Sequence, residues 1–234
     1  MIKRFLTILS ILLFGIPCFA IDVTFDGFVA DEAHILTPTM VEKINNQAKD
    51  LQNRTGADVA VVTLNKKDLR FKQLSDVTLE IGRKHKIGSK DKNEGVVFAL
   101  VPNGNSGNRT RIEVGYGLES VLTDGKCGRI LDDYVMSYYD KKQYEKAVEQ
   151  GFTAIVNELN KYYDNPEEYK KQVGIENRIL LIIFILIIIS GIIVAICDDG
   201  SSGGGYYGGG GFSSGGSFSS FGGGGGFGGG GCGR

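Results

Sequence analysis

Apolar residues recur at helical spacing in several segments of the chain. Val41, Ile44, Ala48 and Leu51 follow one another every three or four residues, which places them on one face of a helix. Thr37-Pro38 supplies an N-cap and a first helical residue, and Gly56 ends the segment. Similar stripes predict three further helices, over 72–86, from Thr123-Asp124 onward and over 144–163.

Short apolar runs between these helices are typical of strands. Val59 to Leu64 and Gly95 to Val101 read as buried strands, and residues 109–114 alternate between polar and apolar. With one strand before the first helix, the order is β-α-β-α-β-β-α-α. This order predicts an α/β fold, a single layered domain with a small, mostly parallel sheet that contains one hairpin.

One stretch near the end of the chain is apolar throughout. Ile179 to Cys197 contains nineteen residues and no charge. As a helix it is about 28 Å long, close to the hydrocarbon thickness of a bilayer. The sequence therefore predicts a single transmembrane helix over 178–197, and a protein that is integral to the cell membrane.

The first twenty residues are typical of a secretory signal peptide. Lys3 and Arg4 precede the apolar segment 5–16, and Cys18-Phe19-Ala20 resembles a cleavage site. An uncleaved membrane helix and a lipid anchor on Cys18 are the alternatives. A signal peptide predicts an extracytoplasmic domain, periplasmic or extracellular, with the tail in the cytoplasm. The lysines and arginine before the span oppose this orientation.

Residues 198–234 form a low-complexity tail. Twenty of its last thirty-five residues are glycine, which loses the most backbone entropy on ordering. The composition predicts a disordered tail that acts as a flexible tether. Aromatic residues spaced by glycine leave open a second interpretation, a docking segment with weak multivalent contacts. The remaining residues, 21–177, are enough for one domain.

Charge and cysteine usage exclude some classes of partner. The chain carries 26 Lys+Arg against 27 Asp+Glu, whereas binding to nucleic acid favours a basic excess. Between 21 and 177 there is one cysteine, Cys127, and the chain has two histidines. These residues cannot form a zinc site without carboxylates. We therefore expect no nucleic-acid partner and no zinc.

Acidic residues at loops are the remaining candidates for chemistry. A nucleophile elbow, a P-loop and an HExxH sequence are missing, and Gly115-Tyr116-Gly117 is a weak signal for phosphate binding. Carboxylates gathered at one end of a sheet suit Ca²⁺ or another hard divalent cation. The candidate metal ligands are Asp31, Glu94, Glu113 and Asp124, to which Asp132 and Asp133 could add. The alternative is that each is an ordinary surface carboxylate.

Three segments resemble the TPM domain family, which is known from thylakoid-lumen and bacterial envelope proteins. They are Val29 to Leu36 (VADEAHIL), Ile87-Gly88 followed by Gly95-Val96-Val97, and Arg111 to Glu119 followed by Leu122-Thr123-Asp124. Their order and spacing fit over residues 23–160. The plan of signal, domain, single span and glycine-rich tail also resembles the family's bacterial membrane type.

The resemblance implies a chemistry as well as a fold. In that family an Asp-rich pocket is associated with Ca²⁺ binding and, in some members, with weak acid phosphatase activity. Here the second block reads Asn93-Glu94-Gly95, where the family usually has Asp-Asn-Gly. The carboxylate is therefore shifted by one position and lengthened, whereas Asp31 and Asp124 keep their places.

Two classes of function follow. The preferred one is an adaptor or quality-control factor for membrane protein complexes, in which a divalent cation stabilises loops. The other is a metal-assisted phosphatase that hydrolyses phosphomonoesters, with Asp31, Glu94 and Asp124 as ligands. No residue stands out in the sequence as a nucleophile or a general acid.

Overall fold

The computed structural model describes residues 21–69, 72–88, 92–167, 169, 171, 182–190 and 227–234. The chain divides into two compact units. The first contains the residues up to Leu159 together with Gly225–Arg234, and the second runs from Asn160 to Gly224. The sheet and the layers of helices described below belong to the first unit.

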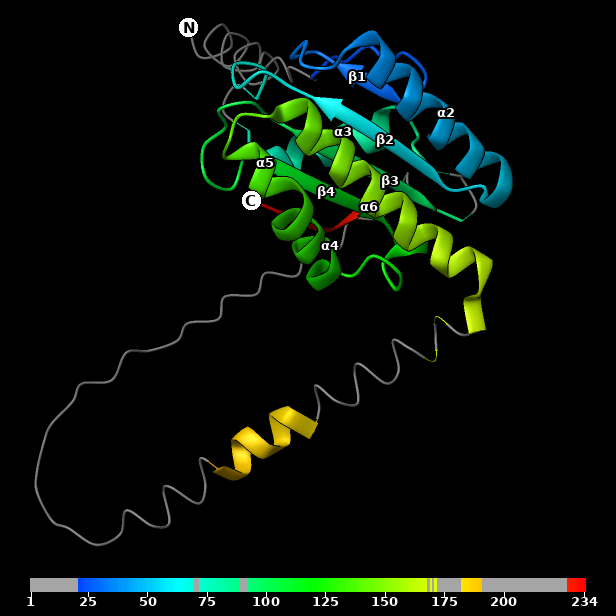
Figure 1. The fold of residues 1–234 in the computed structure, drawn as a ribbon, viewed down its shortest axis with the longest axis vertical. Coiled ribbons are helices and arrows are strands. Elements are labelled where there is room, and N and C mark those ends of the chain that lie inside the picture. The colour runs from blue at the N-terminus through cyan, green and yellow to red at the C-terminus, as the bar shows by residue number, and fades with distance from the viewer. Residues whose placement is uncertain are drawn as a thin grey trace, which may run out of the picture. The chain divides into compact units, whose positions relative to one another are not determined.

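Five strands form one mixed sheet in the order β1-β2-β3-β4-β5 (Figure 1). Strands β1 to β3 are parallel, while β4 is antiparallel to both of its neighbours, β3 and β5. The α/β prediction and the β3–β4 hairpin are confirmed, but the sheet is mixed and not mostly parallel, because two of its four strand pairings are antiparallel. The strands are β1 (Val29–Asp31), β2 (Asp58–Thr63), β3 (Gly95–Leu100), β4 (Thr110–Gly115) and β5 (Phe227–Gly233).

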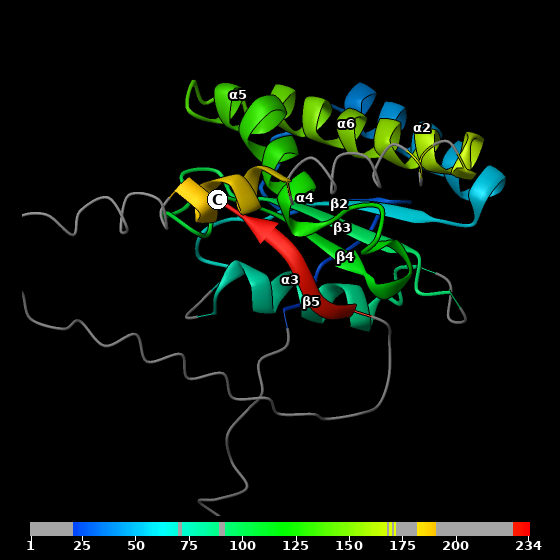
Figure 2. The same ribbon diagram turned by 90° about the horizontal axis from the view of Figure 1, so that it is seen from below.

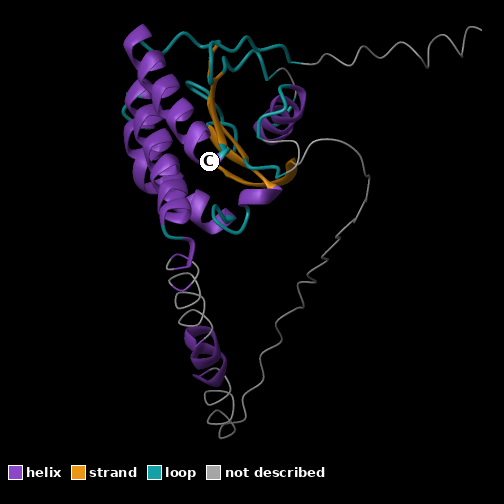
Figure 3. Ribbon diagram, turned by 90° about the vertical axis from the view of Figure 1, so that its right-hand side faces the viewer, coloured by secondary structure: helices purple, strands orange, loops and turns teal. Residues whose placement is uncertain are grey.

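Helices cover both faces of the sheet. Figures 2 and 3 show α2, α6 and the helical segment from α4 to α5 on one face, with α3 on the other. The helices are α2 (Pro38–Thr55), α3 (Leu74–Lys84), η1 (Tyr116–Leu118), α4 (Asp124–Ile130), the π-helix η2 (Leu131–Met136), α5 (Ser137–Tyr139) and α6 (Tyr144–Asp164).

The ends of α2 lie where the sequence predicts them. The Thr37 hydroxyl accepts a hydrogen bond from the Met40 N–H at 3.3 Å, and Pro38 is the first helical residue. At the other end Gly56 is left-handed, with φ of 83°, and donates its N–H to the carbonyl of Gln52. A residue with a Cβ would be strained at this φ, so glycine ends the helix.

Alternate residues of β3 build two cores. Val97 and Ala99 share one core cluster with Val77 and Ile81 of α3. Phe98 points to the other face, where a Cβ placed on Gly151 of α6 would lie 2.6 Å from its ring. Since every residue of β3 is buried, the strand holds the two helical layers together.

Close backbone contacts join the loop before β3 to the end of β4. A Cβ at Gly115 would lie 2.3 Å from the carbonyl oxygen of Asn93, and one at Gly117 would lie 2.1 Å from that of Lys92. The Gly117 N–H also bonds to the Asn93 carbonyl at 3.2 Å. The Gly-Tyr-Gly sequence therefore serves close packing of the backbone.

Strand β5 corrects the prediction of a tail without structure. Residues 227–233 come from the glycine-rich tail, yet they pair with β4 from Arg111 to Gly115. The backbone entropy of glycine and the few side chains available for burial oppose order in this segment. The backbone N–H and C=O groups along the edge of β4 need partners, however, and a strand from the tail supplies them.

The membrane prediction falls largely outside the described residues, as does the predicted signal peptide. Of residues 178–197 the structure describes 182–190, which are helical. Within the described part of the chain, no helix combines the length and the apolar character needed to cross a membrane.

We expect Gly117→Ala to destabilise the full chain by about 1–3 kcal/mol, because its methyl group would displace backbone. Gly125→Ala in α4 is the matched control, since nothing lies within 4 Å of a Cβ there. Urea unfolding of both variants measures the difference. Equal midpoints for the two would contradict the close packing of Gly117.

Candidate functional site at the sheet edge

Asp31, the first predicted ligand, holds its own loop in place. Its carboxylate accepts hydrogen bonds from the Thr63 hydroxyl and from the N–H groups of Ile35 and Leu36, the latter two at 3.2 and 3.1 Å. The residue ends β1 and is half-buried. These contacts explain why a carboxylate stands at the beginning of this loop.

Asp31 and Glu94 lie at opposite ends of the parallel strands. Asp31 pairs with Thr63 of β2, and Thr63 pairs with Leu100, the last residue of β3. Glu94 instead comes directly before Gly95, the first residue of β3. Six residues of strand at about 3.3 Å each separate the two levels by about 20 Å. One cation cannot bind both carboxylates.

Glu113, the third candidate, lies inside the protein. Its side chain is 0% exposed, and its Oε2 is 2.8 Å from the Nη2 of Arg111. The hydroxyl of Thr78 on α3 lies 3.5 Å from the same oxygen. Burial raises the pKa of Glu113, while the Arg111 guanidinium acts in the opposite direction. This carboxylate is committed to a buried ion pair.

The four predicted ligands do not fit one cation site. Asp124, the fourth, lies in the first turn of α4 and accepts a hydrogen bond from the Gly231 N–H at 2.9 Å. Among the described residues, no group of three or more His, Cys, Asp or Glu side chains could hold a metal ion.

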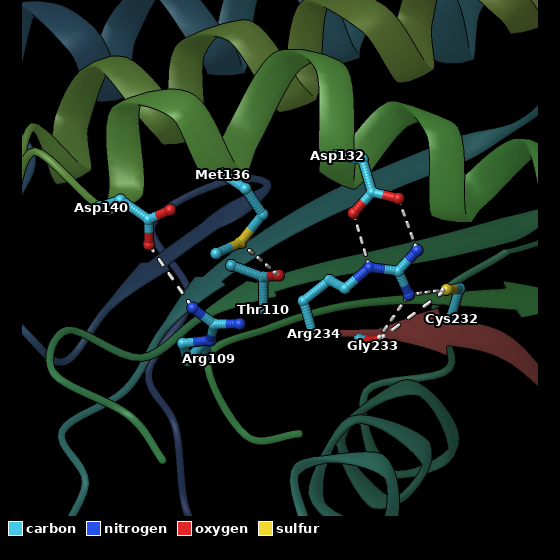
Figure 4. Close-up of polar contacts among 8 residues, drawn as sticks. All are labelled: Arg109, Thr110, Asp132, Met136, Asp140, Cys232, Gly233 and Arg234. Carbon is cyan, nitrogen blue, oxygen red and sulfur yellow. Dashed lines mark hydrogen bonds and ion pairs between the residues drawn. The ribbon is translucent and has the colours of Figure 1, made fainter. Parts of the chain in front are cut away.

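The structure instead brings Asp124 together with Asp132 and the last strand. Asp132 projects from η2 and forms a two-pronged ion pair with Arg234 (Figure 4). The Nε–Oδ1 distance is 2.6 Å and the Nη2–Oδ2 distance is 2.7 Å. Paired bonds of this kind are strong and directional. We call Asp124, Asp132 and the edge of β4 the strand clamp.

Backbone pairing is the other half of the strand clamp. The Arg234 carbonyl accepts hydrogen bonds from the N–H groups of Arg109 and Thr110, at 2.8 and 3.1 Å, and the Arg234 N–H bonds to the Thr110 carbonyl at 3.0 Å. Gly231 and Gly233 stand opposite Glu113 and Arg111. These bonds recognise main chain and would hold any strand that fits.

Charges support this arrangement on the helix side. The Arg234 guanidinium lowers the pKa of Asp132, chiefly through their hydrogen bond. Further along the same helical segment, Asp140 lies 3.4 Å from Arg109 (Figure 4). The helical segment from α4 to α5 thus contacts the edge of the sheet through two acidic side chains, and one of them is paired with the tail.

Steric fit selects glycine in the bound strand. A Cβ at Gly231 would lie 2.4 Å from the Ile112 carbonyl oxygen, and one at Gly230 would lie 2.6 Å from Glu119 Oε1. The next residue, Cys232, lies opposite Ile112 and faces α4, where a Cβ at Gly128 would be 3.4 Å from its sulfur. The clamp therefore has little space for side chains on one side of its ligand.

Cys127 is unsuited to nucleophilic chemistry. Its side chain is buried in α4, and burial raises the pKa of its thiol to about 12. At neutral pH the thiol remains protonated, whereas a nucleophilic cysteine is a thiolate. Two cysteines of the described residues lie in this region, buried Cys127 and half-buried Cys232.

Sequence reasoning identified Asp124 and Asp132 but not their partner. Asp124 is a predicted cation ligand and Asp132 a possible addition to the same site, and in the structure both contact residues of the tail. The signal that could have revealed the strand is Arg234, the one cation of residues 198–234. Its pairing with a carboxylate 102 residues away could not be read from local spacing.

We expect Asp31→Asn to destabilise the full chain by about 1–3 kcal/mol in Ca²⁺ and in chelator alike, because an amide oxygen replaces a carboxylate that accepts three hydrogen bonds. Asp50→Asn, in an exposed ion pair with Arg54, is the matched control and should change little. Thermal unfolding measures both. A Ca²⁺-dependent rise in the midpoint that Asp31→Asn abolishes would instead make Asp31 a cation ligand.

We expect Glu113→Gln to flatten the pH dependence of stability. Burial raises the pKa of Glu113, so the folded chain retains this proton where the unfolded chain has lost it. This carboxyl therefore lowers the free energy of unfolding as pH rises above about 4.3, the ordinary glutamate value. Urea unfolding between about pH 4 and 7 measures the slope. Exposed Glu42→Gln is the control, and parallel curves for both variants would contradict the assignment.

Comparison with known proteins places this geometry in a family. The family model of the TPM domain matches residues 29–158. The N-terminal domain of a protein from P. gingivalis, solved by NMR, is 29% identical with a TM-score of 0.53. The match covers 59% of this chain and 85% of that chain. The BA42 protein of Bizionia argentinensis is 16% identical with a TM-score of 0.44, and that match covers 54% and 83% of the two chains. The search of curated proteins finds no match. Since the family model matches more than half of the chain, this protein belongs to the TPM domain family.

Proposed function

We propose that this protein is a membrane-anchored adaptor, whose TPM domain binds an extended segment of protein at the edge of its sheet. The observation that carries the proposal is the strand clamp. It recognises main chain through β4 and side chain through Asp132. Addition of a strand to an exposed sheet edge is a recurring mode of peptide recognition.

The chemistry of the domain supports binding over catalysis. The Asp31 carboxylate is occupied by hydrogen bonds within the domain. Oε2 of Glu113 is occupied by the ion pair with Arg111, while its Oε1 is buried without a hydrogen-bond partner among the described residues. The thiol of Cys127 is buried and protonated. Peptide binding at a sheet edge needs neither an activated nucleophile nor a cation, so it is compatible with the states of Asp31, Glu113 and Cys127.

Membrane attachment is the second part of the proposal. The apolar segment 179–197 carries no charge, and its described residues expose large apolar side chains, among them Ile182 and Phe184. An exposed apolar surface of this kind is typical of contact with lipid or another protein. Anchoring would hold the domain, on the extracytoplasmic side, next to complexes in the same membrane.

A phosphatase that depends on a cation is the second candidate, and the name of the matched family model includes that activity. One observation favours it. Glu94 Oε2 is buried and lacks a hydrogen-bond partner among the described residues, with the ammonium of Lys92 4.0 Å away. A buried oxygen of this kind calls for a water molecule or an ion.

Peptide binding in trans tests the adaptor. Gly231→Val should displace β5 and leave the clamp open in an otherwise full chain. A fluorescent peptide with the sequence of residues 227–234 should then bind this variant saturably, as measured by anisotropy. The same peptide carrying Gly231→Val is the matched control and should bind at least about tenfold more weakly, which corresponds to about 1.4 kcal/mol.

The same preparation distinguishes the two candidates. Without saturable binding of the peptide to a folded variant, the adaptor proposal is wrong. A generic phosphomonoester, supplied with Ca²⁺ or Mg²⁺, tests the second candidate. Saturable turnover by the wild-type chain that Glu94→Gln abolishes would favour the phosphatase.

A further inference from the structure

The tail and the clamp are complementary in charge. Residues 198–234 carry two acidic side chains, Asp198 and Asp199, and one cation, Arg234. The Arg234 guanidinium forms an ion pair with Asp132. Gly233, two residues after Gly231, pairs with Arg111 of β4. The single basic side chain of the tail thus meets a carboxylate of the domain.

The clamp also discriminates by shape. Gly231 and Gly233 lie against the backbone of β4, where a Cβ would come within 2.4 Å of the Ile112 carbonyl oxygen and 3.2 Å of the Thr110 carbonyl oxygen. The first contact excludes a side chain and the second leaves little room for one. A ligand must therefore carry a glycine against the Ile112 carbonyl, is favoured by a second glycine two positions later, and carries a basic residue three positions after the first.

Pairing between β4 and β5 constrains the position of the tail. The two strands exchange backbone hydrogen bonds within one compact unit of the same chain. Such bonds form only when both segments are in the same compartment. A single crossing by 178–197 would separate them, so the pairing conflicts with the expected cytoplasmic location of the tail.

We propose that the clamp selects a glycine-rich strand with a basic side chain, and that residues 227–234 are its resident ligand. These residues then lie on the same side of the membrane as the TPM domain. The inference rests on the proposed function and adds the class of ligand to it. A partner segment must displace the tail, which competes as an intramolecular ligand.

Alkylation of Cys232 in the full chain measures occupancy of the clamp. Chymotrypsin cuts after Phe227 and releases residues 228–234, in which Cys232 is the one cysteine. Gly231→Val should release the strand and speed alkylation about tenfold, as expected when local opening limits access. Slow alkylation of buried Cys127 verifies that each variant is folded.

A charge exchange tests selection by Arg234. Asp132→Arg and Arg234→Asp should each speed alkylation of Cys232, and the double variant should restore slow alkylation. Asp133→Arg is the matched control, because it changes net charge equally on the same π-helix and should leave the rate unchanged. If the double variant reacts as fast as the single ones, the ion pair does not select the ligand.

Sidedness is tested in cells with a membrane-impermeant maleimide. The thiol introduced by Asn46→Cys, on the exposed side of α2, reports the side of the domain. Gly231→Val in the same chain keeps Cys232 accessible. The inference is supported if both thiols are labelled before lysis, or if both are labelled only after lysis. Labelling of one before lysis and of the other only afterwards would overturn it.

The tests distinguish this inference from the proposed function. The peptide could bind in trans while Cys232 of the wild-type chain is alkylated fast. This result would support the adaptor proposal but show that the tail is not the resident ligand of the clamp. Slow alkylation of Cys232 without binding of the peptide in trans would confirm that the tail is an internal strand and would contradict the adaptor proposal.

Discussion

The need to pair the edge of β4 is the constraint on which the rest of this structure depends. Every backbone N–H and C=O along a sheet edge needs a partner, and an open edge invites one from another chain. Here residues 227–233 supply it, from a segment with almost no side chains to bury. Glycine suits this role because a Cβ at Gly231 would lie 2.4 Å from the Ile112 carbonyl oxygen. Main-chain pairing and the Asp132–Arg234 ion pair therefore both hold residues 227–234 at this edge.

Strand direction decides what the acidic residues can do. Because β1, β2 and β3 are parallel, Asp31 at the end of β1 and Glu94 before β3 lie at opposite ends of the sheet. Glu113 alternates onto the face covered by α3, where Arg111 pairs with it. Carboxylates that look like one set along the sequence thus serve a loop, a buried ion pair and a strand clamp. Because of this division, Asp31 and Glu94 cannot be ligands of one cation.

The glycines of the family-like segments have a shared physical role. Gly115 and Gly117 let the end of β4 lie against the backbone of residues 92 and 93. The helix η1 begins between these glycines, and α4 with Asp124 follows it along the chain. The same glycines, considered as a local pattern, suggest phosphate binding. Their function becomes clear only when the segment they contact is known.

The sequence by itself determined the helices, four of the strands and the family. Helical stripes such as Ile44, Ala48 and Leu51, the cap at Thr37 and the buried run of β3 are local, because each depends on neighbours within a few residues. The resemblance to the TPM domain, carried by short segments, was confirmed by the family match. Tertiary structure decided the fifth strand, the separation of the four predicted ligands and the partner of Asp132. Those features depend on contacts between residues more than a hundred positions apart, such as Arg111 and Gly233, and neither periodicity nor composition encodes which distant segments meet.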